Sequence, residues 1–426
     1  MAAVRNIFTD VRVQQVLEQT ARWRKVVRQQ DITLVKHGST VGDALCKLSA
    51  AEVLSAPIIR HFGTDDAASE KLGRQDHKRY AVIGCADVNS ILLALLQAID
   101  DEDATIFLHT RESMTCAETN DLALKLNTVA DTFFRKPIMD ISPSDDGGVL
   151  YTSDLQANLL TLVSDIFLYP KNKSRSVHRL AVFDQNGEVC NMLSQSDVLR
   201  YIYLHRDKLY ALAFETVERL HLATSPVATA YSSLPTVLAF KRLFDEEVSA
   251  LAIVDEGDGH LIGNLSVSDL RGISPAVFGC LALPIAEFWK RKCDEGIFRE
   301  RLPGGSHATT HSDKSKEVDA KENVEYHELP SSFHASCENI SIHPLTCTPD
   351  SSLESVMRMI VENQIHRVYV IDNGYKPVGV VTITDILWAL SGHTEECNAY
   401  DKFEAPPDEA PSAAAYSGPV VDSGLK

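Results

Sequence analysis

Aspartates that follow a hydroxyl-bearing residue recur along this sequence and offer its clearest binding chemistry. Three pairs in which a serine or threonine stands three residues before an aspartate directly follow an apolar, strand-like stretch: Ser194/Asp197, Ser266/Asp269 and Thr382/Asp385. A carboxylate at the start of a helix can accept hydrogen bonds from two neighbouring ribose hydroxyls, as in dinucleotide-binding folds. Aspartate also caps helices simply because it is favoured at their first turn. Sugar binding and capping are compatible, and both interpretations stay open.

Two histidine–arginine pairs offer a complementary site for an anion. They are His178–Arg179 and His366–Arg367, and each leads into a β-branched stretch. Arginine suits multidentate contacts with phosphate, so these pairs are candidate phosphate ligands. The alternative is a surface pair at the start of a strand.

Motifs for catalysis or metal binding are missing from the chain. It contains no Gly-x-x-x-x-Gly-Lys loop, no Gly-x-Ser-x-Gly elbow, no His-Glu-x-x-His motif and no Cys-x-x-Cys pair. Without a nucleophile beside a base, the sequence predicts no catalytic residue. It also predicts no metal site, because the remaining histidines are dispersed.

The aspartates and the histidine–arginine pairs belong to a unit that is repeated along the chain. Near the C-terminus a helical stripe from Leu353 to Val361 precedes the strands at 368–372 and 378–382, which flank the turn at Asn373–Gly374. Asp385 then opens another helix. The same order appears around Asp197 and Asp269. An eroded first copy ends at Asp87, where Gly84 stands in the place that we assign to the hydroxyl.

We therefore expect an α/β fold of four tandem βαββα units, because one unit alone cannot bury its apolar strands. The units are expected to form two pairs, and the pairs a disc. The expected segments are an N-terminal helical segment at 1–30, a first unit at 31–100 with a loop insertion at 61–79, a helical linker at 101–140, a second unit at 141–207, a third at 217–288, a flexible loop at 291–334, a fourth unit at 335–392 and a disordered tail at 393–426.

Composition narrows the class of partner. The net charge of −18 disfavours broad contact with a nucleic-acid backbone, and no apolar run is long enough for a membrane span. Nine scattered cysteines and the lack of a signal peptide favour a reducing compartment, the cytoplasm and also the nucleus.

With these motifs in place, the repeats resemble CBS domains, which pair into Bateman modules. The four-copy layout is similar to the γ subunits of AMP-activated and SNF1-type protein kinases, chiefly through the His-Arg pairs and the stretches Val368–Asp372 and Val378–Asp385. The resemblance implies that the aspartates, including Asp87, hold ribose and that Thr229 and Thr348 touch the adenosine. The sequence departs from the γ pattern at Glu246–Glu247, where those subunits usually have a basic residue.

The resemblance implies a non-catalytic regulatory subunit that senses AMP, ADP or ATP and acts on the catalytic and scaffold (α and β) subunits of a kinase. The nucleotide would be a regulatory ligand and not a catalytic cofactor. Two alternatives come from other classes. One is a CBS-domain scaffold or adaptor that binds no nucleotide, and the other is a regulator of a phosphatase or another enzyme.

Overall fold

The computed structural model describes residues 8, 10–23, 32–61, 80–102, 107, 114–141, 152–168, 177–294 and 344–391. Most of the expected insertion at 61–79 and of the expected loop at 291–334 lies outside these residues, as does the expected tail at 393–426.

The described chain forms four three-stranded sheets with one common topology. In each sheet the first strand pairs in parallel with the second, and the second pairs antiparallel with the third. The sheets define repeats 1 to 4: β1 (Val35–Lys36), β2 (Ser55–His61) and β3 (Tyr80–Asp87); β4 (Thr152–Asp154), β5 (Arg179–Phe183) and β6 (Val189–Ser194); β7 (Thr229–Tyr231), β8 (Ala250–Val254) and β9 (Leu261–Ser266); β10 (Thr346–Cys347), β11 (Arg367–Ile371) and β12 (Pro377–Thr382). The expected α/β fold of four repeated units is confirmed.

A register shift sits at the same place in every sheet and fixes which residues correspond. It follows Ile58 in β2, Val182 in β5, Ile253 in β8 and Val370 in β11. Counting back three residues from each shift gives one set of equivalent positions: Ser55, Arg179, Ala250 and Arg367. Their partners on the neighbouring strand form a second set: Asp87, Ser194, Ser266 and Thr382.

Helices lie between the first and second strands and after the third strand of the repeats. The helices are α3 (Val41–Ala50) and α4 (Val88–Glu102); α7 (Leu159–Leu162), which continues as a π-helical turn η5 (Val163–Phe167), and α8 (Gln195–Leu204); α9 (Thr236–Asp245); α11 (Leu353–Glu362) and α12 (Ile383–Ser391). Their apolar residues recur on one face, as the sequence pattern predicted.

Repeat 3 departs from the predicted pattern after Asp269. The expected helix is only a 3-10 turn, η7 (Val267–Leu270), and a second 3-10 segment follows, η8 (Pro275–Ala282). Gly272 has a φ of +83°, and Pro275 lacks the backbone N–H that a continuing helix needs. The prediction of a regular helix here was wrong because these two residues interrupt it.

Further helices outside the repeat pack on its edges. They are α2 (Val13–Gln19), α6 (Cys116–Arg135) and α10 (Ile285–Asp294), with the short 3-10 segments η1 (Ala21–Trp23), η4 (Ile138–Asp140) and η6 (Arg206–Phe214). Helix α2 packs on α8, α6 packs on η8, and α10 packs on α9. No helix within the described ranges is both long and apolar enough to cross a bilayer.

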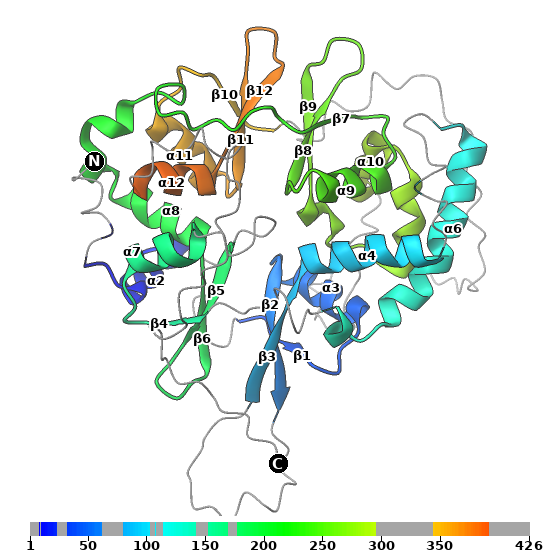
Figure 1. Ribbon diagram of the computed structural model, residues 1–426, viewed down its shortest axis with the longest axis horizontal. Helices are drawn as coiled ribbons and strands as arrows, with labels where there is room; N and C mark the ends of the chain where they lie inside the picture. The colour runs from blue at the N-terminus through cyan, green and yellow to red at the C-terminus, as the bar shows by residue number, and fades with distance from the viewer. Residues whose placement is uncertain are drawn as a thin grey trace, which may run out of the picture.

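Two large hydrophobic cores join repeats that are not consecutive in the sequence. One core unites repeats 1 and 3, with Phe240, Phe278 and Phe288 fully buried. The other unites repeats 2 and 4 through helices α8, α11 and α12. Burial of this apolar surface is the main favourable term in holding each side together. The helices therefore lie on the two outer sides of the molecule, and the four sheets lie around its centre (Figure 1).

Consecutive repeats meet through their sheets. Between repeats 3 and 4, the Tyr369 hydroxyl donates to Asn264 Oδ1 at 2.8 Å and the Leu261 N–H donates to the Tyr375 carbonyl at 2.9 Å. Between repeats 1 and 2, Val82 packs against a small cluster that contains Ala181. The sheets of repeats 1 and 2 occupy one half of Figure 1, and those of repeats 3 and 4 the other. This arrangement agrees with two paired modules facing each other.

The contact between α10 and β9 gives a first prediction. A Cβ on Gly263 would lie 2.2 Å from Cη2 of Trp289, so Gly263→Ala must displace the ring or the helix. We expect a loss of about 1–3 kcal/mol in the free energy of unfolding, the usual cost of overpacking. Urea unfolding followed by circular dichroism measures it. Gly38→Ala is the matched control, since no atom lies within 4 Å of its Cβ. Equal unfolding midpoints for the two variants would contradict the packing described.

Candidate functional site

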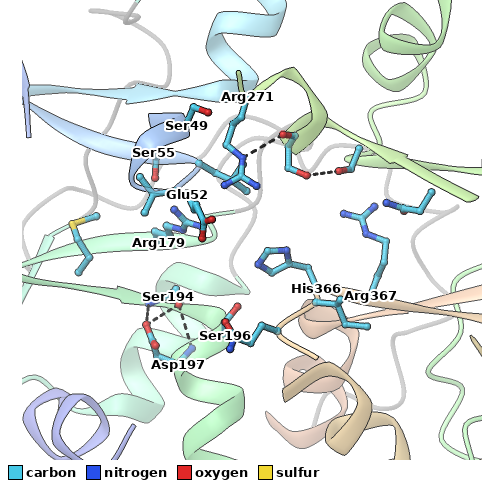
Figure 2. A pocket seen from close by; sticks show the side chains of 18 of the residues that line it. Ser49, Glu52, Ser55, Arg179, Ser194, Ser196, Asp197, Arg271, His366 and Arg367 are labelled. Carbon is cyan, nitrogen blue, oxygen red and sulfur yellow. Dashed lines mark hydrogen bonds between the residues drawn. The ribbon is translucent and has the colours of Figure 1, made fainter. Parts of the chain in front are cut away.

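A cavity of about 800 Å³ lies where the four repeats meet, and each repeat contributes to its wall. Its volume falls in the range typical of small-molecule sites. The polar lining includes Glu52 and Ser55 from repeat 1; Arg179, Ser194, Asp197 and Arg200 from repeat 2; Asn264, Ser266 and Arg271 from repeat 3; His366, Arg367 and Tyr369 from repeat 4; and Lys292 from α10 (Figure 2).

The strand register places the two predicted motifs at the same end of a sheet. Arg179, the first residue of β5, pairs with Ser194 at the end of β6, and Arg367 pairs with Thr382 in the same way. The hydroxyl begins the next helix and the aspartate follows within its first turn. Each of these two arginines therefore lies next to a hydroxyl–aspartate pair. We call each hydroxyl–aspartate pair of the chain a corner.

Cations that the sequence analysis did not single out complete the cavity. Arg200 follows Asp197 by three residues and Arg271 follows Asp269 by two, so an arginine soon after two of the three aspartates is the sequence signal for these cations. Lys292 had no such signal, because only the packing of α10 on repeat 3 brings it to the wall. With Arg179 and Arg367 there are five strongly basic side chains around one space.

The pKa values of the basic groups reflect their burial. Burial lowers the pKa of Arg179, of Arg271 and of Arg367. Burial, together with the nearby charges of Arg179 and Arg367, lowers the pKa of His366 to about 4. The side chain opens onto the cavity but is enclosed by the surrounding repeats, so its charged form is poorly solvated. His366 is therefore neutral near pH 7 while the arginines remain charged.

His178 lies beside the same group of charges. Burial lowers its pKa, and a contact between Nδ1 and Gln195 Oε1 at 3.4 Å and the nearby Asp87 carboxylate oppose that shift. Gln195 is 4% exposed and also accepts from the Thr384 hydroxyl at 3.0 Å. A single buried amide thus connects His178 of repeat 2 with the helix of repeat 4.

The three hydroxyl–aspartate corners share one geometry. In each, Oδ2 accepts from the backbone N–H of the hydroxyl residue, at 2.9 Å for Asp197, 2.8 Å for Asp269 and 2.7 Å for Asp385. The same oxygen accepts from the hydroxyl at 2.7, 3.2 and 2.6 Å respectively. Helix capping, the alternative open from sequence, therefore uses Oδ2 and leaves Oδ1 for other partners.

The corners differ at Oδ1. Arg200 Nη1 lies 3.2 Å from Asp197 Oδ1, and Lys292 Nζ lies 2.7 Å from Asp269 Oδ1. Within the part of the chain that the structure describes, Asp385 Oδ1 accepts only a long hydrogen bond of 3.4 Å, from the Thr224 hydroxyl. Burial raises the pKa of Asp385, and the hydrogen bonds from Thr382 and Thr224 and the charge of Arg367 oppose that rise. This corner has the carboxylate with the weakest partner at Oδ1.

Two sequence-based assignments need correction. The register makes Asp87 equivalent to Ser194, so Asp87 stands at the hydroxyl position and Ser90 at the aspartate position. Asp87 Oδ1 accepts from the Asn89 N–H at 2.8 Å, and burial raises its pKa against the pull of Arg179 and His178. The apparent match with Gly84 arose because the register shift in β2 cannot be seen in the sequence.

The two threonines expected to touch adenosine are not equivalent to each other. Thr229 pairs with Ala252, and the corresponding residue of repeat 4 is Thr346, which pairs with Tyr369. Thr348 lies two residues further on, is exposed, and its N–H donates to Ser351 Oγ at 3.0 Å. Six predicted residues line the central cavity: Arg179, Ser194, Asp197, Ser266, His366 and Arg367. The other seven lie outside its lining: Asp87, His178, Thr229, Asp269, Thr348, Thr382 and Asp385.

Comparison with known proteins agrees with the repeated fold. The family model of the CBS domain matches residues 217–275 and 337–392, so the chain contains CBS domains. Over 263 residues it is 23% identical to the AMP-activated protein kinase subunit gamma-3 of Bos taurus, covering 60% of this chain and 40% of that protein. It is 22% identical over 217 residues to the corresponding gamma subunit of Saccharomyces cerevisiae, covering 49% and 52%. The predicted resemblance to these γ subunits is confirmed.

Two further similarities place the chain more widely. Protein SDS23 of Candida albicans is 27% identical over 113 residues, which cover 26% of this chain and 18% of that protein. A crystal structure from Methanocaldococcus jannaschii, a protein suggested to be an archaeal homologue of γ-AMPK, has a TM-score of 0.50 and 14% identity, and the match covers 88% of this chain and 99% of that one. The structural match shows the fold alone. The chain spans well under two thirds of the curated relatives that it matches.

The lowered pKa of His366 predicts how the stability of the fold depends on pH. Because the pKa of His366 falls from 6.5 to about 4 in the folded chain, the unfolded state binds the proton more readily between these values. Stability should therefore fall as the pH is lowered from about 6.5 towards about 4. Urea unfolding of the wild type and of His366→Gln across this range measures the effect, and the variant should lose less stability. A histidine resonance that titrates at or above pH 6.5 and disappears in His366→Gln would contradict this account.

Proposed function

We propose that this chain is a non-catalytic regulatory protein, γ-like, that binds AMP, ADP or ATP at its centre and communicates the bound state to a SNF1/AMP-activated-type serine/threonine kinase. One observation carries the proposal. The arginines of two His-Arg pairs, Arg179 and Arg367, meet in a single cavity with three more cations, beside the hydroxyl–aspartate corners.

The charge of the cavity supports phosphate as one end of the ligand. Five strongly basic side chains face a space that also holds the carboxylates of Glu52 and Asp197. Arginine forks match phosphate oxygens, and their attraction for an anion is stronger where the surroundings exclude bulk water. A mono-, di- or triphosphate would relieve the mutual repulsion of Arg179, Arg271 and Arg367.

The corner of repeat 4 supports ribose as the other end. Asp385 Oδ2 is held by Thr382, while Oδ1 has only the long contact with the Thr224 hydroxyl. Two vicinal ribose hydroxyls could replace that contact. Arg367 lies near enough for its charge to act on the Asp385 carboxyl, so sugar and phosphate would be held by neighbouring groups. We therefore assign the first nucleotide to this corner.

Nucleotide binding would affect the arrangement of the repeats, because residues at the cavity also make contacts between repeats. Arg367 of repeat 4 also donates to Ser249 Oγ of repeat 3 at 3.0 Å, and Gln195 joins repeats 2 and 4. A ligand that draws Arg367 towards phosphate competes with the contact to Ser249. Such a ligand changes the arrangement of the repeats to the extent that it binds one arrangement more tightly than another. The catalytic and scaffold subunits of the kinase would bind the altered surface, in the cytoplasm or the nucleus.

A scaffold or adaptor that binds no nucleotide is the second candidate, with a regulator of a phosphatase or another enzyme as its variant. The ion pairs Asp197–Arg200 and Asp269–Lys292 favour it, because they occupy the oxygens that ribose would need. Repeats 1 and 3 also carry Ser55 and Ala250 where repeats 2 and 4 carry arginine.

Thermal unfolding of the purified chain with millimolar AMP, ADP or ATP separates the two candidates. Binding to the folded state must raise the melting temperature by mass action, with about 2.7 kcal/mol gained at a ligand concentration 100 times the Kd. We expect the rise in the wild type and its loss in Asp385→Asn, since that change removes the charge that ribose hydroxyls would contact. Asp197→Asn should retain most of it, because Arg200 already occupies Asp197.

The control for these variants is Asp350→Asn, at an exposed position just before α11. It should show the full rise in melting temperature. The proposal fails if none of the three nucleotides raises the melting temperature of the wild type. The assignment to the repeat 4 corner fails if Asp385→Asn, still folded, responds like the wild type.

A further inference from the structure

Helix α10 inserts a lysine into the corner of repeat 3. Lys292 Nζ lies 2.7 Å from Asp269 Oδ1 and donates to the Asp269 backbone carbonyl at 3.3 Å. The two side chains are 26% and 19% exposed, so this pair is more enclosed than an ordinary surface ion pair. At the equivalent place in repeat 4, the neutral Thr224 hydroxyl contacts Asp385.

The position of Lys292 is set by the packing of the whole helix. Ile285 and Phe288 are fully buried, and Trp289 lies on Gly263 of β9, where only a glycine leaves room for the ring. Lys292 follows Phe288 by four residues and Trp289 by three, so it shares their face of the helix. Packing of this face of α10 on repeat 3 therefore places the Lys292 ammonium group next to Asp269.

Asp269 has both carboxylate oxygens engaged as a result. Oδ2 accepts from the N–H of Ser266 at 2.8 Å and from its hydroxyl at 3.2 Å, and Oδ1 accepts from Lys292. A pair of ribose hydroxyls can bind Oδ1 only after the ammonium has moved away. That exchange would replace an ion pair between opposite charges by hydrogen bonds from uncharged hydroxyls, so the direct attraction of the ammonium group for the carboxylate would be lost.

We propose that Lys292 is a specificity-determining residue that closes the repeat 3 corner to nucleosides, so that it limits the number of nucleotides the chain binds. This inference rests on the proposed function, since it concerns the same ligand class. The helix that carries the lysine lies outside the βαββα repeat and follows repeat 3. The closed corner is therefore a property added to the repeat by α10, and removal of the ammonium opens it.

The test counts bound nucleotides in the full chain by native mass spectrometry, with AMP and with ATP as probes. Lys292→Met removes the charge and keeps a side chain of similar length, and it should bind one nucleotide more than the wild type. Lys290→Met, at an exposed position on the same helix, is the matched control and should bind the wild-type number. The double variant Lys292→Met/Asp269→Asn should return to the wild-type number, because the freed carboxylate has been neutralised.

Thermal melting confirms that each variant is folded, and Lys292→Ser replaces Lys292→Met if the latter melts early. The inference is overturned if folded Lys292 variants bind the wild-type number, or if the extra nucleotide persists in the double variant. Binding by the wild type with no gain in the variants defeats this inference and leaves the proposed function standing. No binding by the wild type, with one nucleotide bound by Lys292→Met, defeats the proposed function and supports the inference. No binding by either defeats both.

Discussion

The burial of cations around one cavity is the constraint on which this structure depends. Five strongly basic side chains from three repeats and from α10 face a common space, and two histidines lie close by. Removing charged groups from bulk water costs free energy unless a carboxylate or a bound anion compensates them. The hydrophobic cores on the two outer sides offset that cost, because each core joins two repeats through buried apolar side chains.

The even and odd repeats carry different residues at the first position of the second strand. Repeats 2 and 4 carry His178–Arg179 and His366–Arg367 at the start of their second strands, and the corresponding arginine positions of repeats 1 and 3 are Ser55 and Ala250. The short residues leave room for the arginine of the opposing sheet, and Arg367 reaches across to Ser249. At this strand position, one sheet of each facing pair thus carries an arginine and the other carries a small side chain.

Much of the fold could be predicted from the sequence, because local chemistry specifies it. β-branched strands, Asn-Gly turns and amphipathic helices identified the repeats, and Gly187 has the positive φ of 74° that such a turn requires. The prediction of a regular helix after Asp269 followed the apolar pattern and did not take account of Gly272 and Pro275, which interrupt it. We predicted that Asp87 corresponds to the other three aspartates and that Thr348 corresponds to Thr229. Both predictions were wrong, because equivalence depends on strand register and bulges, which a linear pattern does not reveal.

The candidate site also contains residues that could be predicted from the sequence and residues that could not. Arg179, Arg367 and the hydroxyl–aspartate corners were predictable since they recur at fixed spacing within a repeat. Lys292 reaches Asp269 only through the packing of α10, and Gln195 joins two repeats across 189 residues of sequence. Contacts of this kind come from tertiary packing, so they could not be derived from one unaligned sequence.

The most direct measurement is a crystal structure of the full chain grown with AMP. We predict the phosphate within hydrogen-bonding distance of the Arg179 or Arg367 guanidinium, and the ribose hydroxyls on Asp385. A nucleotide bound away from Asp385 and from both arginines, or no bound nucleotide at saturating AMP, would contradict this assignment.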